Sequence, residues 1–329
     1  MLINTETDQR NRNVALVVSF IIAGVLCVIG FYRPLAFLGL PLAGLAHYFI
    51  RRKTRRRLQV IAEPFPDVWE ATLQTHVAYY RNLADDQKVR FQNLMKVFLD
   101  EVDITGIRTE VDESTRALVA ASAVIPIMGF DDFEYSGLGE VLIYPNSFDE
   151  DYQTDSPDDA HTLGMIGVNH LSGVMILSKP SLIAGFDNKN DKHNVGIHEF
   201  AHLVDKADGE VDGVPPGIDA DTFDPWVKWI GEELRRDVGK GEHIDDYAYT
   251  NEAEYFAVLT EYFFESPAIL EKKNPKLYQM LRTMYHQDPK RIFGKRGKRR
   301  RKRIGRNSPC PCGSGEKFKR CCKRKAAIA

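Results

Sequence analysis

The residues best suited to chemistry in this chain form a His-Glu-x-x-His sequence, from His198 to His202. On a helix, residues four apart lie one turn apart on the same face, so both imidazoles can reach one metal ion. Glu199, beside the first histidine, then lies near a water on that ion. The pattern predicts a catalytic zinc for peptide-bond hydrolysis, with His198 and His202 as ligands. The alternative is a pair of hydrogen-bonded helix histidines without a metal.

The sequence around the motif favours a helix that Asn194 caps at its start. Its apolar residues would bury one side of that helix; they are Val195, Ile197, Phe200, Ala201, Leu203 and Val204. A catalytic zinc keeps three protein ligands and one open position, so a third ligand must come from elsewhere.

Several residues are candidates for the third ligand. Asp205, Asp208, Glu210 and His243 lie close in the sequence. The best prospect is Glu254, on a helix expected to start near Asn251, with Val258 and Glu261 along the same face. Asn251 and Glu254 also fit a capping box, so spacing alone leaves the role of Glu254 open.

The pairing of H-E-F-A-H-L-V-D with N-E-A-E-Y-F-A-V-L-T-E-Y-F-F resembles the zinc metallopeptidase family of Mlc titration factor A. That family is itself similar to the anthrax lethal factor catalytic domain. Weaker likenesses, among them P-F-P-D-V-W and I-Y-P-N-S-F, extend over most of Leu58 to Tyr285. The resemblance implies a zincin-like fold, in which His198, His202 and Glu254 bind zinc.

The resemblance also implies roles in catalysis. Glu199 would accept a proton from water and later deliver it to the leaving amine. Tyr247 matches the tyrosine placed at the reacting carbonyl, although the neighbouring Tyr249 is an alternative. The family is also associated with capture of a transcriptional repressor, so a regulatory binding protein on a metallopeptidase scaffold is the rival function.

Three features near the site have two interpretations each. Asp205 and Glu261 are candidate hydrogen-bond acceptors that orient the histidines, or exposed helix carboxylates. The strand Val174 to Leu177 offers an edge to an extended peptide substrate, or pairs within the sheet.

Four cysteines near the C-terminus predict a second zinc site. In N-S-P-C-P-C-G-S-G-E-K-F-K-R-C-C a Cys-x-Cys pair precedes a Cys-Cys pair, which gives four thiolates for a tetrahedral structural zinc. The ligands would be Cys310, Cys312, Cys321 and Cys322. The segment closely resembles the SEC-C motif, the zinc knuckle at the end of the preprotein translocase motor, which implies recruitment of a protein partner. Disulfides are the alternative.

A basic linker, residues 294–306, joins the two predicted zinc sites. Residues 290–325 carry 17 Lys or Arg against one acid, although the whole chain has a net charge of −2. The linker has too few apolar residues to pack, and its charge suits anionic lipid, RNA or an acidic partner. A solvated linker is the plainer interpretation.

The N-terminal region predicts a membrane anchor. Val14 to Tyr32 is uncharged and long enough to span a bilayer, and a second apolar run, Leu35 to Ile50, ends in the basic cluster Arg51 to Arg57. We expect a transmembrane hairpin in a bacterial inner membrane, with both termini and the catalytic domain in the cytoplasm. A cleaved signal peptide, or one span followed by an interfacial segment, are the alternatives.

The chain of 329 residues, 43% hydrophobic, is long enough for one large domain with appendages. Helical periodicity near residues 84–100 and 116–128, with short strands at 140–144 and 174–177, predicts the α+β class. The expected organisation is a membrane anchor over 1–57, a metallopeptidase domain over 58–293, the linker over 294–306 and the SEC-C motif over 307–325. The expected cofactors are two Zn²⁺, one catalytic and one structural, and the expected partners are a peptide or protein substrate and a protein bound by the SEC-C motif.

Overall fold

The computed structural model describes residues 5–146, 164–166, 173–188, 193–215, 218, 220–235 and 244–294. The chain divides into a unit of residues 1–290 and a second unit of residues 291–329. Three segments lie outside the described residues: the acidic stretch 149–159, whose composition predicts a surface loop, the cysteine motif, and nearly all of the basic linker.

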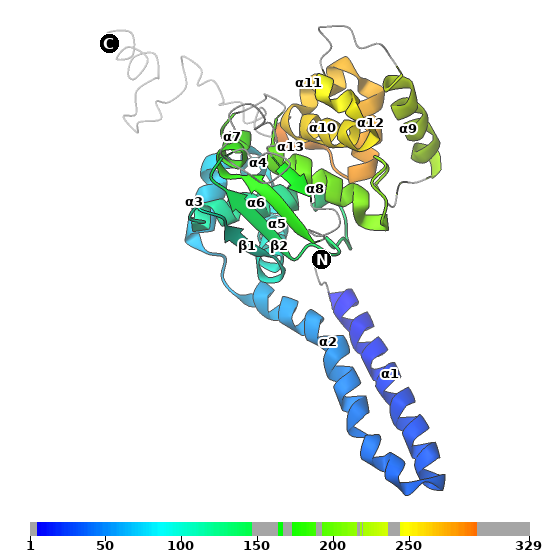
Figure 1. Cartoon of the computed structure of the whole chain (residues 1–329). Coiled ribbons are helices and arrows are strands. Elements are labelled where there is room, and N and C mark those ends of the chain that lie inside the picture. Colours follow the sequence, from blue (N-terminus) through cyan, green and yellow to red (C-terminus); the bar gives the residue numbers. More distant parts are fainter. Residues whose placement is uncertain are drawn as a thin grey trace, which may run out of the picture. The chain divides into compact units, whose positions relative to one another are not determined.

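Two helices form the N-terminal part. Helix α1 (Thr5–Tyr32) is followed by the short 3-10 helix η1 (Pro34–Gly39) and by α2 (Pro41–Ala62), and α1 and α2 lie side by side (Figure 1). Arg51 of α2 pairs with Asp8 of α1 at 2.7 Å and donates to Asn11 at 3.0 Å. Between the two helices, at Arg33 and η1, the chain therefore folds back on itself.

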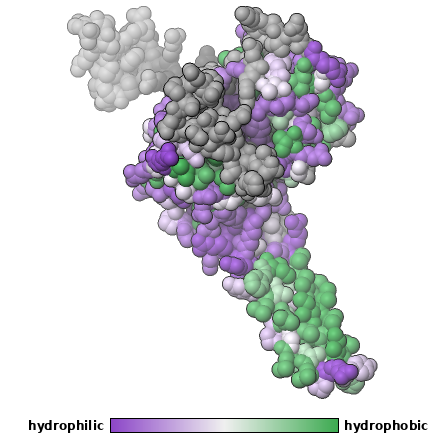
Figure 2. Space-filling model, in the orientation of Figure 1, coloured by the Kyte–Doolittle hydropathy of each residue, from purple (hydrophilic) through white to green (hydrophobic). Residues whose placement is uncertain are grey.

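The two helices differ in composition. Among the described helices, α1 alone is long and apolar enough to cross a membrane, with a mean hydropathy of 2.9 in its most apolar 18-residue window. Apart from the polar start of α1 and the turn between the helices, apolar residues cover the surface of α1 and the first part of α2 (Figure 2). Helix α2 continues through the basic cluster to Ala62, beyond the expected domain boundary at residue 57. A second transmembrane span therefore stays a prediction.

A small sheet and a larger set of helices make up the rest of the first unit. The strands β1 (Asp103–Gly106), β2 (Glu140–Tyr144), β3 (Gly164–Ile166) and β4 (Val174–Ser178) lie in the order β1-β2-β4-β3. The pairs β1/β2 and β2/β4 are parallel, whereas β3 pairs antiparallel with β4. Strand β4 is thus an inner strand, and the antiparallel edge belongs to β3.

The helices of this part are α3 (Asp67–His76), α4 (Ala78–Asn82), α5 (Asp85–Glu101), α6 (Glu113–Ile127), α7 (Lys179–Asp187), α8 (Val195–Asp205), η3 (Lys206–Asp208), α9 (Ala220–Glu233), η4 (Asp246–Thr250), α10 (Glu252–Glu265), α11 (Pro267–Lys273) and α12 (Pro275–Tyr285). Helix α13 (Pro289–Gly294) includes the boundary between the two units. The fold is a mixture of helices with a small, mainly parallel sheet, which agrees with the expected class.

The core holds α8 in place between α6, α5 and α10. Gly196 lets α8 approach α6 closely, because a Cβ at that position would lie 2.1 Å from Ser122 Oγ. On the next turn the ring of Phe200 packs edge-on against Phe98 of α5, with centroids 5.6 Å apart, and lies 5.1 Å from Tyr135. Close helix packing of this kind fixes the direction in which the histidines of α8 point.

Candidate metal centre

Helix α8 presents the two histidines on one face. Asn194 caps the helix, since its side chain accepts a hydrogen bond from the Ile197 N–H at 3.1 Å. The opposite face is buried, and Ile197 and Phe200 are at most 1% exposed. His198 and His202 retain side-chain exposures of 12% and 13%, so both imidazoles lie at the edge of the core rather than inside it.

Helix α10 brings Glu254 to the same place. Asn251 caps this helix by accepting a hydrogen bond from the Glu254 N–H at 2.9 Å. The Glu254 carboxylate reaches His198 Nε2 at 3.1 Å and His202 Nε2 at 3.5 Å. Asn251 thus provides the expected N-cap, while the side chain of Glu254 points to the histidines.

The three side chains have the spacing that a tetrahedral metal ion needs. The two Nε2 atoms lie 3.2 Å apart, and each lies 3.1 to 3.5 Å from an oxygen of Glu254. Ligand atoms about 2.1 Å from a tetrahedral zinc lie roughly 3.4 Å from one another. His198, His202 and Glu254 form the group of candidate metal ligands in the described part of the chain. Two imidazoles and one carboxylate are donors that zinc accepts.

Glu261 orients the first histidine. Its Oε1 lies 2.8 Å from His198 Nδ1, and its Oε2 accepts the backbone N–H of Asn194 at 2.5 Å. With a metal ion in place of the proton on Nε2, donation from Nδ1 to the carboxylate would keep the Nε2 lone pair directed at the convergence point. Asn194 also donates from its side chain to the Gly185 carbonyl at 2.9 Å. One asparagine therefore connects the end of α7, the start of α8 and the middle of α10.

The charges around the histidines favour bound cations. Burial alone would lower the pKa of His198, but the charge of Glu261 and hydrogen bonds with Glu254 and Glu261 hold that pKa well above its usual value. Burial would raise the pKa of Glu254, but its hydrogen bonds to His198 and His202 hold it well below the usual range. The negative charge of Glu254 faces both imidazoles, and that of Glu261 faces His198. The same negative charge that favours a protonated histidine would also favour a divalent metal ion.

Glu199 lies on α8 next to the first histidine and is 5% exposed. Burial raises the pKa of its carboxyl group, although the nearby His198 and His202 oppose that change. The structure therefore gives this residue a secluded position beside the three converging side chains.

Asp205, at the end of α8, is a candidate acceptor for a hydrogen bond from a histidine, but the contact that the structure describes is with the backbone of Gly213. Its Oδ2 accepts the Gly213 N–H at 2.9 Å, while Oδ1 is buried without a hydrogen-bond partner among the described residues. Burial raises the pKa of Asp205 to about 6, even though the Gly213 N–H lowers it. An interaction of Asp205 with the histidines stays a prediction.

For several other predicted site residues, the structure describes only the backbone or does not describe the residue. The backbone of Tyr247 belongs to η4, directly before α10, but its side chain is not among those described. Tyr249 packs its ring 5.7 Å from that of Tyr255. His243, the side chain of Asp208 and the four cysteines are likewise outside, and Glu210 is exposed.

Comparison with known proteins gives the family. A model of the glucose-regulated metallopeptidase family M90 matches residues 50–286, which include the whole candidate metal centre. The chain belongs to this family. The M90 match spans more than two thirds of the chain, and it joins the His-Glu-x-x-His helix to the helix of Glu254.

The chain is also similar to individual proteins over much of their length. Mlc titration factor A of Cronobacter sakazakii is 30% identical over 238 residues, 69% of this chain and 87% of the relative. Mlc titration factor A of Pectobacterium atrosepticum is 29% identical over 236 residues, 67% of this chain and 86% of the relative. An uncharacterized protein of Synechocystis is 29% identical over 245 residues, covering 71% and 89%.

A second motif follows the M90 region. Residues 306–324 match the SEC-C motif, which agrees with the resemblance expected from the cysteine spacing. All four predicted cysteine ligands fall within this match.

Sequence reasoning missed part of what Asn194 does. Its capping role is visible in the sequence because asparagine before an apolar helix is a start signal. Its backbone contact with Glu261 joins positions 67 residues apart, and no local pattern indicates such a pair.

Proposed function

We propose that this chain is a membrane-anchored zinc peptidase of the M90 family. The observation that carries the proposal is the convergence of His198, His202 and Glu254 within 4.8 Å, with Glu261 orienting the first histidine. Such a set binds zinc with three ligands and leaves one position open, which is the arrangement of catalytic rather than structural zinc sites.

The reaction is hydrolysis of a peptide bond. Zinc bound by the three side chains would supply Lewis acidity for the scissile carbonyl and for a water. Glu199 is placed to take a proton from the attacking water and to give it to the leaving amine. Tyr247 would donate a hydrogen bond to the oxygen of the reacting carbonyl.

The first experiment measures zinc and activity together. The purified full chain should hold two zinc ions, one per predicted site. Glu254→Ala should remove one, and replacement of the four cysteines by serine should remove the other. Glu199→Gln should keep both ions and lose cleavage of a peptide library by a factor of at least about 100, because the proton acceptor is gone.

Either of two results would overturn the peptidase proposal. The first is a folded Glu254→Ala chain that keeps both ions, since Glu254 would then be a helix-cap residue only. The second is a Glu199→Gln chain that cleaves peptides as fast as the wild type.

A second candidate function is capture of a protein partner. Two relatives are named Mlc titration factor A, which points to binding of a regulator by those proteins. Binding without hydrolysis would survive Glu199→Gln, because that change leaves the surface nearly unaltered. A partner that binds wild type and Glu199→Gln equally, and is never cleaved, would favour this function over the first.

The remaining parts of the chain have proposed roles in location and recruitment. We propose that α1 anchors the chain in the inner membrane, with α2 as a second span or an interfacial segment, and the catalytic domain in the cytoplasm. The SEC-C motif, residues 307–325, would hold the structural zinc and bind a protein partner, and the 294–306 linker would add attraction to anionic lipid or RNA. Deletion of residues 307–329 should abolish partner capture and leave peptide cleavage unchanged.

A further inference from the structure

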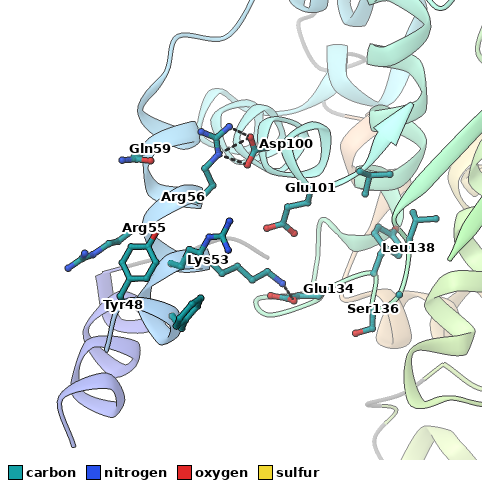
Figure 3. A pocket seen from close by; sticks show the side chains of 15 residues that line it. Tyr48, Lys53, Arg55, Arg56, Gln59, Asp100, Glu101, Glu134, Ser136 and Leu138 are labelled. Carbon is teal, nitrogen blue, oxygen red and sulfur yellow. Dashed lines mark hydrogen bonds and ion pairs between the residues drawn. The ribbon is translucent and has the colours of Figure 1, made fainter. Parts of the chain in front are cut away.

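A cavity lies where α2 meets the end of α5 and the segment that leads into β2. Its volume is about 1180 Å³, and its walls include Asp100 and Glu101 of α5 and the residues from Glu134 to Leu138 (Figure 3). From α2 come four cations of the basic cluster, together with Tyr48 and Phe49. The cavity is separate from the candidate metal centre, since none of its walls contains a proposed ligand.

Most cations of the basic cluster already have partners. Arg56 donates to both oxygens of Asp100, and Lys53 lies 2.6 Å from Glu134. Arg57, which is buried, pairs with Glu101 at 2.5 Å and with Glu134 at 2.6 Å. The three carboxylates at the cavity are thus engaged by three cations.

The carboxylate of Glu134 is ionised at neutral pH. Partial burial would raise its pKa, but hydrogen bonds from Arg57 and Lys53 lower that pKa to about 2. The Glu134 carboxylate therefore carries a charge, and its hydrogen-bond donors are the paired cations Lys53 and Arg57 of α2.

Two arginines remain. Arg52 and Arg55 line the cavity and are exposed, and neither has a carboxylate partner in the part of the chain that the structure describes. Figure 3 shows Arg55 beside Tyr48, pointing away from Asp100 and Glu134. After the internal pairs are counted, the cavity has an excess of two guanidinium groups, which bind phosphate through several parallel N–H donors.

The other walls suit an amphipathic ligand. Tyr48 and Phe49 are 52% and 62% exposed and stand at the end of the apolar part of α2, directly before the basic cluster. Aromatic residues in this position lie at the headgroup level of a bilayer. Val102 and Leu138 add apolar surface to the cavity, and Ser136 adds a hydroxyl group. A free phosphate ion would use only the guanidinium groups, whereas a lipid would use both kinds of surface.

We propose that this cavity binds the headgroup of an anionic phospholipid, with the phosphate held by Arg52 and Arg55 and the glycerol region against Tyr48 and Phe49. The inference rests on the membrane anchoring proposed above, and not on the peptidase activity. A lipid in this place would lie between α2 and the segment from Glu134 to Leu138, and it would brace the catalytic domain on its anchor.

The test compares lipid selectivity of the full chain in nanodiscs of phosphatidylcholine. Spin-labelled phosphatidylglycerol and spin-labelled phosphatidylcholine report, by electron paramagnetic resonance, the relative affinity of each lipid for the protein. Wild type should prefer phosphatidylglycerol. Arg52→Gln with Arg55→Gln should lower that preference, by about fivefold for each guanidinium removed. These two side chains are exposed, so the double variant should fold normally.

The matched control removes two charges at the same end of the helical pair but outside the cavity. Arg10→Gln with Arg12→Gln should change the preference much less. Equal losses in the two double variants would show a general surface attraction and overturn the proposal.

Two further results would also overturn it. Inorganic phosphate that abolishes the preference, where chloride of equal ionic strength does not, would assign the cavity to a free anion. A chain that never enters nanodiscs would refute the anchor itself, whereas a chain that inserts without lipid preference would refute only the lipid site.

Discussion

The substitution Glu261→Gln removes the charge that orients His198. The Glu261 carboxylate accepts from two donors, His198 Nδ1 at 2.8 Å and the Asn194 N–H at 2.5 Å. Glutamine has the same shape, but it offers one oxygen and one NH₂ group. As long as His198 Nδ1 carries a proton, one of the two donors then faces the amide NH₂ group, whichever way the amide turns.

The expected effects follow from these contacts. A buried donor left without an acceptor costs about 1–3 kcal/mol in the free energy of unfolding. Loss of the carboxylate behind a ligating histidine typically weakens metal binding by about 10–100-fold, or roughly 1.4–2.7 kcal/mol. We therefore expect Glu261→Gln to be less stable without zinc and to bind zinc 10–100-fold more weakly.

Competition against a fluorescent zinc chelator measures the affinity, and thermal unfolding of the metal-free chain measures the stability. The matched control is Glu265→Gln, one turn later on α10. Glu265 accepts from the side chain of the same Asn194, at a longer 3.4 Å. If the two variants weaken zinc binding equally, or if Glu261→Gln binds zinc like the wild type, Glu261 does not act through His198.

Three further predictions concern the packing that holds the site. Gly196→Ala should destabilise the domain by about 1–3 kcal/mol in thermal unfolding, because the new Cβ would lie 2.1 Å from Ser122 Oγ; Ser122→Gly should restore part of the loss. Gly213→Ala should cost at least about 1–3 kcal/mol, because the position has a φ of +76° and the Cβ would lie 2.4 Å from the Glu252 carbonyl oxygen; an unchanged melting temperature would contradict this. The pKa of Asp205 is raised from 3.8 to about 6, so the folded chain binds a proton on this carboxyl group more tightly than the unfolded chain does. The protonated carboxyl group therefore stabilises the fold fully below pH 3.8, and this stabilisation is lost as the pH rises through 6. The metal-free wild type should therefore lose up to about 3 kcal/mol between pH 4 and 6 that Asp205→Asn does not lose, as measured by denaturant unfolding across that range.

The fold could be predicted where local pattern and burial agree. Strand β2 has the predicted bounds, and the buried helix expected from Arg116 to Met128 is α6, at Glu113–Ile127. Helix α5 was also expected, but Val89, which belongs to the apolar helical pattern of residues 84–100, is 56% exposed. Periodicity places a helix in the chain, but it does not fix which side faces the core.

The end of α2 shows a different limit. The expected boundary at residue 57 followed the change from basic to mixed composition. The helix continues to Ala62 because Arg56 and Arg57 pair with carboxylates of α5, and Lys96 of α5 donates to the Ile61 and Glu63 carbonyls at 2.6 and 2.8 Å. Such tertiary contacts cannot be read from composition.

The two helices of the candidate metal centre could each be predicted from local sequence features, namely the spacing of the histidines and the asparagine caps. His198 and His202 are related by helix periodicity alone, and the Asn194 and Asn251 caps fix where the two helices begin. The juxtaposition of Glu254 with the histidines joins residues 56 positions apart. Helix spacing made Glu254 the best prospect but fitted a capping box equally well, so the family resemblance was needed to favour the ligand role.

The two N-caps have a common consequence for the site. Asn251 fixes the start of α10 by accepting the N–H of Glu254, so the cap directly positions a proposed ligand. Asn194 fixes the start of α8, and its own N–H donates to Glu261, which lies two turns after Glu254 on the same face of α10. The start of α8 is therefore tied to α10 through Glu261, and the start of α10 is tied to the backbone of the proposed ligand Glu254. Zinc bound at this point would add a third connection between helices that are already in register, so little rearrangement should accompany binding.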